Sequence, residues 1–447
     1  MTAPGPHILI LCPSMWPEMR SWGETQRMYY LSNFLSDHGW RVSTISPGFE
    51  NASGIEDRAK KYTPHFFGSC LNPEDCVKRL PGQTGENRPG GWTRRIVSAT
   101  LTPFVKWFYN EPDCYEGLSK GLWIRRYRNR ILQWIAENRV DIVLISAPAF
   151  ALFRIGKLVK KNFPFLPIIF DYRDPWHLWN LHRDFAYRKE RNYLKYADGI
   201  VGFSRAFTEE MIAAFRLPEE TCTTIYNGYS EADWTAFEAG ADVVPAFLRE
   251  KQPLKLRLTF TGNISLDDSP GNFRNPAELI RTIRRFPEIE CYFIGVQGPE
   301  AGTAEGNIHY IGKVSQAESF ACMKNSDVLL SIHLDGADCS GKYLISGKFF
   351  DYIRSGRVIW HIGSPDSLMS RWIADYGLGV FCENEPNALC SMLENLTASW
   401  RQGNLSSLRN CSPNSISGFS REYQNTRYLD FIHFIKEHTN EEEKENG

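Results

Sequence analysis

Short apolar runs alternate with helical patterns along most of the chain, and no other feature of the sequence constrains the fold as strongly. Residues 7–12 predict a buried strand, residues 24–38 a helix that Gly39 ends, and residues 41–45 a second strand. Further strands are predicted at 142–146, 167–171, 199–203, 223–226, 256–261, 289–294, 309–311, 328–332, 358–362 and 379–381. This alternation is typical of an α/β fold built on doubly wound parallel sheets.

The length of 447 residues predicts two domains rather than one core. The stretch 231–253 is polar and irregular, which favours a linker there. We therefore expect two Rossmann-like domains facing a cleft, at residues 1–235 and 250–415. The last residues, 437–447, are typical of a solvated acidic tail.

Composition excludes several classes of protein. Lys and Arg number 51 and Asp and Glu 52, a balance that argues against nucleic-acid binding. The eleven cysteines show no CxxC pair and no zinc spacing, which favours reduced thiols in the cytoplasm. We expect no secretory signal at the N-terminus. The longest apolar run, 142–153, is too short and broken to span a bilayer.

The region 88–130 departs from the alternating pattern. It holds nine Lys and Arg residues against three Asp and Glu residues, an excess of six positive charges. Tryptophan and phenylalanine residues are interleaved with them: Trp92, Phe104, Trp107, Phe108 and Trp123. One interpretation is a surface that docks on anionic membrane. The other is an insertion whose aromatic side chains pack inward and whose charges are solvated.

Residues 346–356 predict a short helix whose first turn suits an anion. Ser346 and Gly347 suit the N-terminal cap, and Gly356 suits the left-handed residue that ends the helix. Lys348 in the first turn opposes the helix dipole unless an anion binds there. With Asp351 one turn on, the pattern indicates a nucleotide diphosphate site. The alternative is an ordinary amphipathic helix whose apolar residues lie in the core: Phe349, Phe350 and Ile353.

Polar residues follow three other predicted strands, at the edge where parallel sheets bind ligands. Arg173 and Asp174 follow the strand at 167–171, and either contact a ligand or form an ion pair that fixes the loop. Gly262 and Asn263 follow the strand at 256–261, where they either admit a phosphate or make a tight turn. Gly23 lies ahead of the first helix and permits close approach of a ligand.

Several short segments occur together in one order: FDYRDPW at 170–176, ER with AD near 190–198, NGY at 227–229, FTGN at 260–263, GKFFDY at 347–352 with SG at 355–356, and FSR at 419–421. Their order and spacing, over about residues 7 to 435, resemble those of family 4 glycosyltransferases of the GT-B fold. The resemblance implies transfer of a sugar from a nucleotide-sugar, usually with retention at the anomeric carbon. It also implies a helix at 418–435 that returns to the N-terminal domain.

The resemblance implies a hexosyl- or related transferase that needs no metal or other cofactor. The C-terminal domain would bind a donor that is UDP- or GDP-linked. The N-terminal domain would bind a glycan or lipid-linked acceptor in surface polysaccharide biosynthesis. We expect a cytoplasmic protein, with peripheral association at the inner face of the membrane if the basic region docks there.

Residue roles in donor binding follow by matching the helix at 346–356 to the family. Lys348 and the amides of Ser346, Gly347 and Phe349 would hold the diphosphate leaving group, and Lys348 thereby counts as catalytic. Asp351 would accept hydrogen bonds from the ribose hydroxyls.

The remaining roles belong to the other strand ends. Gly23 would approach the sugar or phosphate, with Gly262 and Asn263 opposite it. Arg173 and Asp174 occupy the place where the family puts catalytic residues that reach the transferred sugar.

Two departures from the family pattern leave alternatives open. The family often has two glutamates eight positions apart, and here these positions hold Tyr343 and Asp351. The basic residue that many members carry shortly after the glycine matched by Gly262 is missing, and Lys342 or Arg274 are the candidates to replace it. A catalytically silent GT-B module that binds nucleotide and a sugar-nucleotide epimerase are the competing hypotheses.

Overall fold

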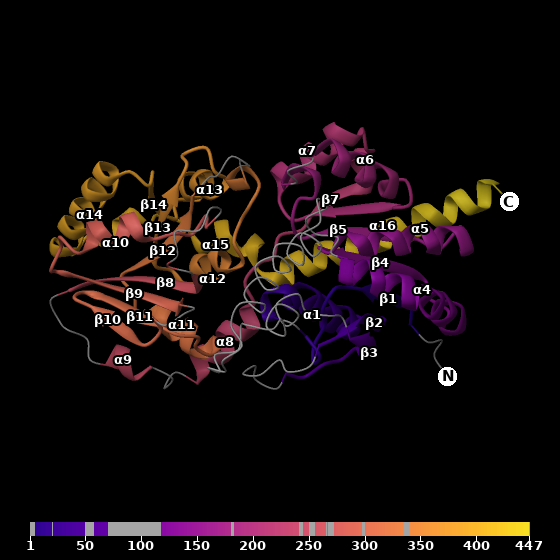
Figure 1. Cartoon of the computed structure of the whole chain (residues 1–447), viewed down its shortest axis with the longest axis horizontal. Coiled ribbons are helices and arrows are strands. Elements are labelled where there is room, and N and C mark those ends of the chain that lie inside the picture. Colours follow the sequence, from indigo (N-terminus) through magenta and orange to yellow (C-terminus); the bar gives the residue numbers. More distant parts are fainter. Residues whose placement is uncertain are drawn as a thin grey trace, which may run out of the picture. The chain divides into compact units, whose positions relative to one another are not determined.

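The structure is a computed structural model that describes most of the chain (Figure 1). The described residues are 5–19, 21–49, 58–69, 118–179, 183–240, 245–249, 255–264, 266, 272–296, 300–334 and 340–446. The chain divides into two compact units, each with its own sheet. Unit 1 comprises Met1–Ile225 with Asn425–Gly447, and unit 2 comprises Tyr226–Gln424.

Unit 1 is built on a parallel sheet. Its strands are β1 (His7–Leu11), β2 (Arg41–Gly48), β3 (Thr63–Ser69), β4 (Ile142–Ala147), β5 (Ile168–Tyr172), β6 (Gly199–Gly202) and β7 (Cys222–Thr224). They lie in the order β3-β2-β1-β4-β5-β6-β7, and all neighbours are parallel. Its helices are α1 (Trp22–Asp37), α4 (Leu118–Asn138), α5 (Phe153–Asn162), α6 (Arg183–Leu194), α7 (Arg205–Phe215) and α16 (Arg421–Asn446), with 3-10 turns η1 (Phe150–Leu152), η2 (His177–Trp179) and η3 (Glu219–Thr221).

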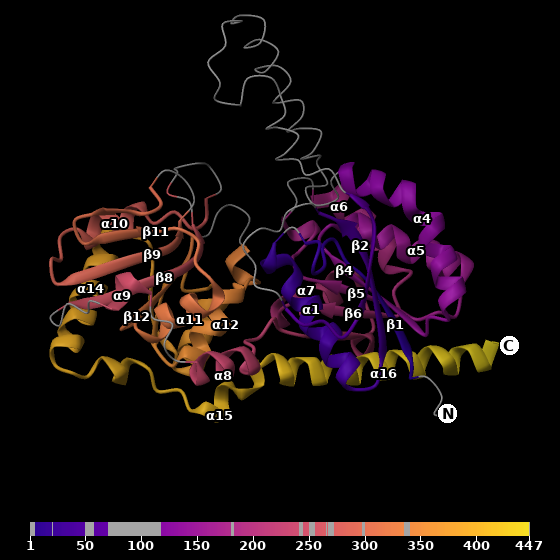
Figure 2. The ribbon, with the colours of Figure 1, turned by 90° about the horizontal axis from the view of Figure 1, so that it is seen from below.

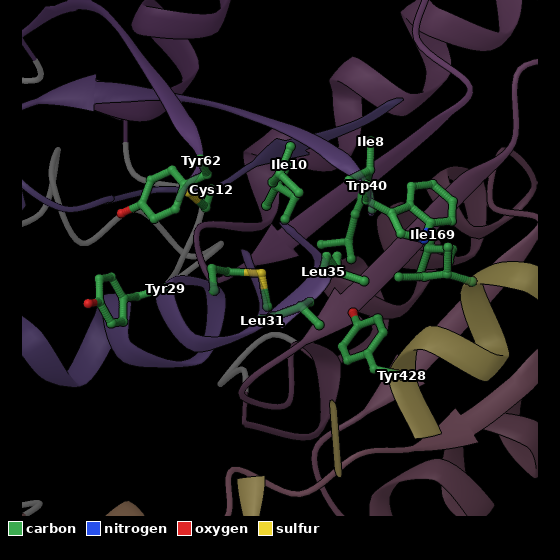
Figure 3. Close-up of a cluster of buried hydrophobic side chains, with 14 of the residues drawn as sticks. Ile8, Ile10, Cys12, Tyr29, Leu31, Leu35, Trp40, Tyr62, Ile169 and Tyr428 are labelled. Atoms are coloured by element: carbon green, nitrogen blue, oxygen red, sulfur yellow. The ribbon is translucent and has the colours of Figure 1, made fainter. Parts of the chain in front are cut away.

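Helices cover both faces of the unit 1 sheet. On one face α1 and α16 pack on β1, where Ile10, Leu31 and Tyr428 belong to one buried cluster (Figure 3). On the other face α5 packs on β5, and the rings of Phe153 and Phe170 stack with their centroids 4.1 Å apart. The alternation of side chains along each strand thus supplies two apolar layers, as the buried parallel arrangement requires.

Unit 2 has a second sheet of the same kind. Its strands are β8 (Leu256–Ile264), β9 (Ile289–Val296), β10 (Thr303–Glu305), β11 (Ile308–Ile311), β12 (Val328–His333), β13 (Val358–Gly363) and β14 (Gly379–Cys382). The order is β10-β11-β9-β8-β12-β13-β14, and β10 alone is antiparallel to its neighbour among these strands. Its helices are α8 (Glu231–Ala239), α9 (Ala246–Arg249), α10 (Ala277–Ile283), α11 (Gln316–Lys324), α12 (Gly347–Ser355), α13 (Leu368–Tyr376), α14 (Pro386–Arg401) and α15 (Pro413–Ile416), with 3-10 turns η4 (Ser340–Lys342), η5 (Leu405–Leu408) and η6 (Ser417–Phe419).

The core of unit 2 also has two layers. Helices α10 and α14 pack on one face of the sheet, in a cluster that includes Phe260 and Trp360. Helices α11, α12 and α13 pack on the other face, around Leu329, Phe349 and Ile359. Because α12 buries its apolar residues here, its polar first turn is left at the carboxyl edge of the sheet.

Each sheet has a point where the strand order reverses. In unit 1 this point lies between β1 and β4, and in unit 2 it lies between β8 and β12. The connections leave opposite faces of the sheet at such a point, so a crevice opens outside the carboxyl ends of the two strands. These two edges are therefore where ligand-binding side chains are expected.

The stretch 231–253 was expected to be an irregular linker, and this is wrong for Glu231–Ala239 and Ala246–Arg249, which are helices α8 and α9. Helix α8 begins directly after Ser230, whose side chain accepts a hydrogen bond from the N–H of Asp233 at 3.2 Å. Trp234 of this helix is completely buried and stacks on Phe320 with 4.2 Å between ring centroids. The capping serine and a single large anchor make a stable helix out of a polar sequence.

The basic region 88–130 lies outside the described residues up to 117. In its described part Trp123 packs inward, because it is 3% exposed and donates its indole N–H to the carbonyl of Phe67 at 2.6 Å. Arg125, Arg126 and Arg128 are exposed on the same helix, α4. Within the described residues, no helix is both long and apolar enough to cross a membrane.

Candidate functional site

Helix α12 begins at the carboxyl edge of the unit 2 sheet with unsatisfied polar groups. Ser346 is the N-cap residue, but its hydroxyl does not cap the helix and has no hydrogen-bond partner among the described residues. The helix ends as predicted, with Gly356 in the left-handed conformation at φ 79°. Because the first N–H groups of a helix have no acceptor within it, this end offers donors to an anion.

The amine of Lys348 is buried beside this helix end. Its Nζ atom has no hydrogen-bond partner among the described residues and lies 3.0 Å from the ring centroid of Phe260. Burial, and next the charge of Arg274, lower the pKa of the lysine well below its ordinary value. A buried donor without an acceptor is costly, and a bound anion would remove that cost.

Gly262 and Asn263 lie near the end of β8, and Gly262 lies beside Lys348. The backbone of Gly262 has φ 112°, and a Cβ added there would lie 3.4 Å from Cδ and 3.8 Å from Nζ of Lys348. The carbonyl of Gly262 would in turn lie 2.5 Å from a Cβ added at Gly295. Two glycines, one of them missed by the sequence reasoning, thus let β8, β9 and Lys348 come together.

Arg274, rather than Lys342, is the second cation of the site. Its guanidinium lies near enough to lower the pKa of Lys348, and its Nη1 atom is 3.5 Å from the carbonyl oxygen of Asn263. Burial lowers the pKa of Arg274 itself. Lys342 is exposed, and its amine lies 5.3 Å from the ring centroid of Tyr343.

Helix α12 is fixed to β8 by a buried tyrosine one turn beyond the lysine. The hydroxyl of Tyr352 accepts a hydrogen bond from the N–H of Thr261 at 2.8 Å. Phe349 offers a ligand neither its side chain nor its N–H, because the side chain is fully buried and the N–H donates to the carbonyl of Ser346 at 3.0 Å. Gly347 and Lys348 therefore supply the first-turn N–H groups that remain.

Asp351 lies on α12 but has partners of its own. Its Oδ1 atom accepts a hydrogen bond from the indole N–H of Trp234 at 3.2 Å. Burial raises the pKa of Asp351 to about 6, while the charge of Arg421 acts in the opposite direction. The carboxyl group thus links α12 to α8 through Trp234.

A buried histidine completes the unit 2 edge and was missed in the sequence. His361 on β13 is bonded through Nδ1 to the carbonyl of Ser331, 3.0 Å away, and through Nε2 to the hydroxyl of Ser367, 3.3 Å away. Burial and then the charge of His333 lower its pKa to about 3, and Lys348 adds to the effect. His361 is therefore neutral at ordinary pH and adds no positive charge to the site.

In unit 1 Arg173 and Asp174 follow β5, as predicted, but they form no ion pair with each other. Arg173 donates instead to three backbone carbonyls, those of Ala147 at 3.4 Å, Pro148 at 2.7 Å and Glu24. This guanidinium fixes the loop after β4 to the start of α1. Asp174 makes no hydrogen bond with a described residue, and burial raises its pKa to about 6.

A buried polar network around Asp171 in unit 1 was not predicted. Asp171 is fully buried, and its carboxylate accepts hydrogen bonds from Arg27 at 2.7 and 3.0 Å, from Ser146 at 2.8 Å and from Tyr428 at 3.2 Å. These partners come from α1, β4 and α16. Asp171 is therefore a structural residue that joins these three elements to β5.

Gly23 lies in the first turn of α1 and is exposed. A Cβ added there would meet nothing within 4 Å, so the helix start borders open space. The structure therefore leaves room for a ligand at Gly23 without requiring a glycine there. Within the described residues, no group of three or more His, Cys, Asp and Glu side chains is placed to hold a metal ion, and metal independence stays a prediction.

Residues 23–232 match the family model described as Glycosyltransferase Family 4. The comparison with curated proteins finds no match. Among solved structures, the chain is similar to α,α-trehalose 6-phosphate synthase from Burkholderia multivorans, with TM-score 0.63 and 12% identity over 98% of each chain. It is also similar to sucrose-phosphate synthase from Thermosynechococcus elongatus, with TM-score 0.59 and 10% identity over 96% of this chain and 99% of that one.

A third similar structure is that of an Anabaena protein in complex with UDP and glucose, with TM-score 0.55 and 11% identity. That match covers 95% of this chain and 99% of the Anabaena chain. At such low identities these likenesses establish the fold, which agrees with the two Rossmann-like units expected from the sequence. The chain therefore has the GT-B fold of two Rossmann-like units, and its residues 23–232 resemble family 4 glycosyltransferases.

Proposed function

We propose that the protein transfers a sugar from a nucleotide-diphosphate sugar to a glycan or lipid-linked acceptor, with retention, and that unit 2 binds the donor. One observation carries the proposal: the buried amine of Lys348 and the hydroxyl of Ser346 both lack a partner among the described residues, at the start of α12. Two unsatisfied donors and a helix N-terminus at one place call for an anion with several acceptor oxygens.

A diphosphate leaving group fits this need. Negative charge grows on its oxygens as the bond to the sugar breaks, so donors already fixed around it stabilise the transition state. Lys348, the N–H of Gly347 and the hydroxyl of Ser346 would contact the phosphates, and Arg274 would add the second charge. In this proposal these groups stabilise the charge on the diphosphate, and no metal ion takes part.

Asp351 would bind the ribose of the donor. Its carboxyl group lies on the same helix as Lys348, and its bond to Trp234 leaves one oxygen for a hydroxyl group. The donor is proposed to be UDP- or GDP-linked. The UDP bound in the similar Anabaena structure supports the first choice.

In unit 1 we propose that Asp174 reaches the transferred sugar and that Arg173 positions the loop that carries it. Arg173 donates hydrogen bonds to three backbone carbonyls, whereas Asp174 has no hydrogen-bonded partner among the described residues. The N–H groups near Gly23, at the start of α1, would also contact the sugar or the phosphate.

We further propose a role in surface polysaccharide biosynthesis, in the cytoplasm and at the inner face of the membrane. The exposed arginines of α4 support attraction to an anionic surface. Flotation of the protein on anionic and neutral vesicles at low and high salt tests this part. Equal flotation on both kinds of vesicle would refute the membrane proposal without touching the donor site.

The main test is nucleotide binding and sugar transfer by two matched variants. Lys348→Met removes the buried amine, and Lys342→Met removes an exposed amine six positions earlier. Calorimetric titration with UDP, GDP and their sugars should show a large loss of affinity in the first variant alone. Turnover with a panel of acceptors would then establish the transferase. Nucleotide binding without any turnover would favour the silent module instead, and equal affinities in both variants would refute the donor site.

A further inference from the structure

The loop that carries Asp174 is fixed at both of its ends. It comprises residues 173–176, between strand β5 and the 3-10 turn η2. At the first end Arg173 donates hydrogen bonds to backbone carbonyls near the end of β4 and in α1. At the other end Trp176 is fully buried, and its ring stacks on that of Phe150 with 4.9 Å between the centroids. These two anchors limit the positions that the carboxyl group of Asp174 can take.

A buried carboxylate of α6, that of Glu190, binds the residue that follows this loop. Helix α6 lies beside α5 in unit 1 (Figure 2). The Oε2 atom of Glu190 accepts hydrogen bonds from the backbone N–H of His177 at 3.1 Å and from its Nδ1 atom at 2.7 Å. The ring of His177 also packs edge-on against the rings of Tyr187 and Phe215, whose centroids are 5.6 and 5.1 Å away. Glu190 and two aromatic rings thus fix the orientation of His177.

The same carboxylate lies close to the residue that precedes the loop. This residue is Tyr172, the last of β5. Burial, and next the charge of Glu190, raise the pKa of the Tyr172 hydroxyl well above its ordinary value. Neither this hydroxyl nor the Oε1 atom of Glu190 has a hydrogen-bond partner among the described residues. Glu190 is therefore close to one end of the loop and hydrogen-bonded to the other.

The carboxylate of Glu190 lowers the stability of the fold. The side chain is fully buried, and only one of its oxygens accepts hydrogen bonds, both from His177. An apolar residue of the same size would avoid the cost of desolvating the charge. Asp171 differs, because both of its carboxylate oxygens are hydrogen-bonded. A carboxylate at position 190 is therefore better explained by the geometry of the loop than by stability.

We infer that Glu190 is a positioning residue, which sets the place of Asp174 through His177 and the loop between them. The inference rests on the proposed function, in which Asp174 contacts the transferred sugar. Such a contact depends on distance and angle, so a shift of about 1 Å in the loop can lower turnover about 100-fold. Glu190 is fully buried, so it acts through its neighbours without contacting the sugar.

A double-mutant cycle on the full chain tests this role. Glu190→Leu removes the carboxylate and keeps a side chain of similar size, and Asp174→Asn removes the charge that would reach the sugar. If Glu190 acts through Asp174, Glu190→Leu should lower kcat about 10- to 100-fold in the wild type, but less than about twofold in the Asp174→Asn background. A structural role alone would lower kcat by the same factor in both backgrounds.

Two further variants complete the design. Glu190→Gln keeps the shape and one acceptor oxygen, so it should recover part of the lost kcat, and it replaces Glu190→Leu in the cycle if that variant does not fold. Glu209→Leu removes an exposed carboxylate from α7 and should change kcat by less than about twofold. Because the proposed nucleotide site is in unit 2, Glu190→Leu should change the Kd of UDP and GDP by less than about twofold.

The outcomes separate this inference from the proposed function. The positioning role is overturned if the losses from the Glu190 and Asp174 variants multiply, or if the Glu190 variants turn over as the wild type does. It is also overturned if Glu190→Leu and Glu209→Leu lower kcat equally. Absence of turnover by the wild type with every donor would instead refute the proposed function, and the inference would fall with it.

Discussion

Replacing Lys348 by methionine should make the free protein more stable while it weakens donor binding. In the wild type the amine is buried without a hydrogen-bond acceptor among the described residues. Methionine keeps a side chain of similar length against Phe260 and removes the polar group. The substitution thus replaces an amine that can bind an anion with a thioether that suits an apolar core.

The size of both effects follows from the surroundings of the amine. A buried polar group without a partner costs about 1–3 kcal/mol, so the free energy of unfolding should rise by about that amount. The corresponding rise in the melting temperature is about 2–4 °C per kcal/mol for a unit of this size. Loss of a charge-assisted hydrogen bond to the diphosphate should cost about 1.5–3 kcal/mol in binding, or about 10- to 150-fold in Kd.

The stabilisation should also depend on pH. The pKa of Lys348 is lowered in the folded protein, so the unfolded chain binds a proton that the folded chain does not. Wild-type stability therefore rises with pH until the lysine of the unfolded chain has lost its own proton, near pH 10.4. The difference in the free energy of unfolding between Lys348→Met and the wild type should therefore become smaller as the pH rises over this range.

Thermal and urea unfolding of the free proteins, with titration of UDP and GDP, would measure all three quantities. Lys342→Met is the control, because that amine is exposed and its removal should change stability by no more than about 0.5 kcal/mol. The reasoning is refuted if Lys348→Met lowers the stability of the free protein, since the amine would then have a favourable partner. It is equally refuted if the variant binds nucleotide as the wild type does.

Three further changes have expected outcomes. Arg27→Met leaves the buried carboxylate of Asp171 without its cation and should lower the free energy of unfolding by about 3–5 kcal/mol in urea titrations; a loss below about 1 kcal/mol would contradict the proposed role of the pair. The pKa of His361 is lowered to about 3, so stability should fall by about 1.4 kcal/mol per pH unit as the pH drops from about 6.5 towards 3, and His361→Gln should flatten this slope in unfolding measured across that range. Gly262→Ala places a Cβ at φ 112° and 3.4 Å from Lys348 Cδ, so calorimetry should show weaker nucleotide binding, whereas unchanged affinity would remove Gly262 from the site.

Features that depend on neighbouring residues could be predicted from the sequence. The strand–helix alternation predicted both sheets except for one edge strand of each, β3 and β10. Lys348 and Gly356 correctly marked the first turn and the end of α12. In these cases the physical cause, a backbone preference or a helix dipole, acts within one or two turns. The same local reasoning missed α8, because its stability depends on the burial of Trp234 against a distant helix.

Contacts between residues far apart in the sequence could not be predicted. Arg27 and Asp171 are separated by 144 residues and leave no local pattern that marks them as partners. Arg274 reaches the lysine only because the strand order brings the ends of β8 and β12 together. Asp351 looked like a ligand group on a free helix face, yet it is bonded to Trp234, 117 residues earlier.

The carboxylate of Asp171 also sets an order of events during synthesis of the chain. One of its hydrogen bonds comes from Tyr428, which lies 257 residues later in the sequence, after all of unit 2. The ribosome therefore releases the strands and α1 of unit 1 first, but the part of the apolar face that α16 covers stays exposed until that helix emerges. Unit 2 can fold during this interval, so the unit that begins first is the last to be finished.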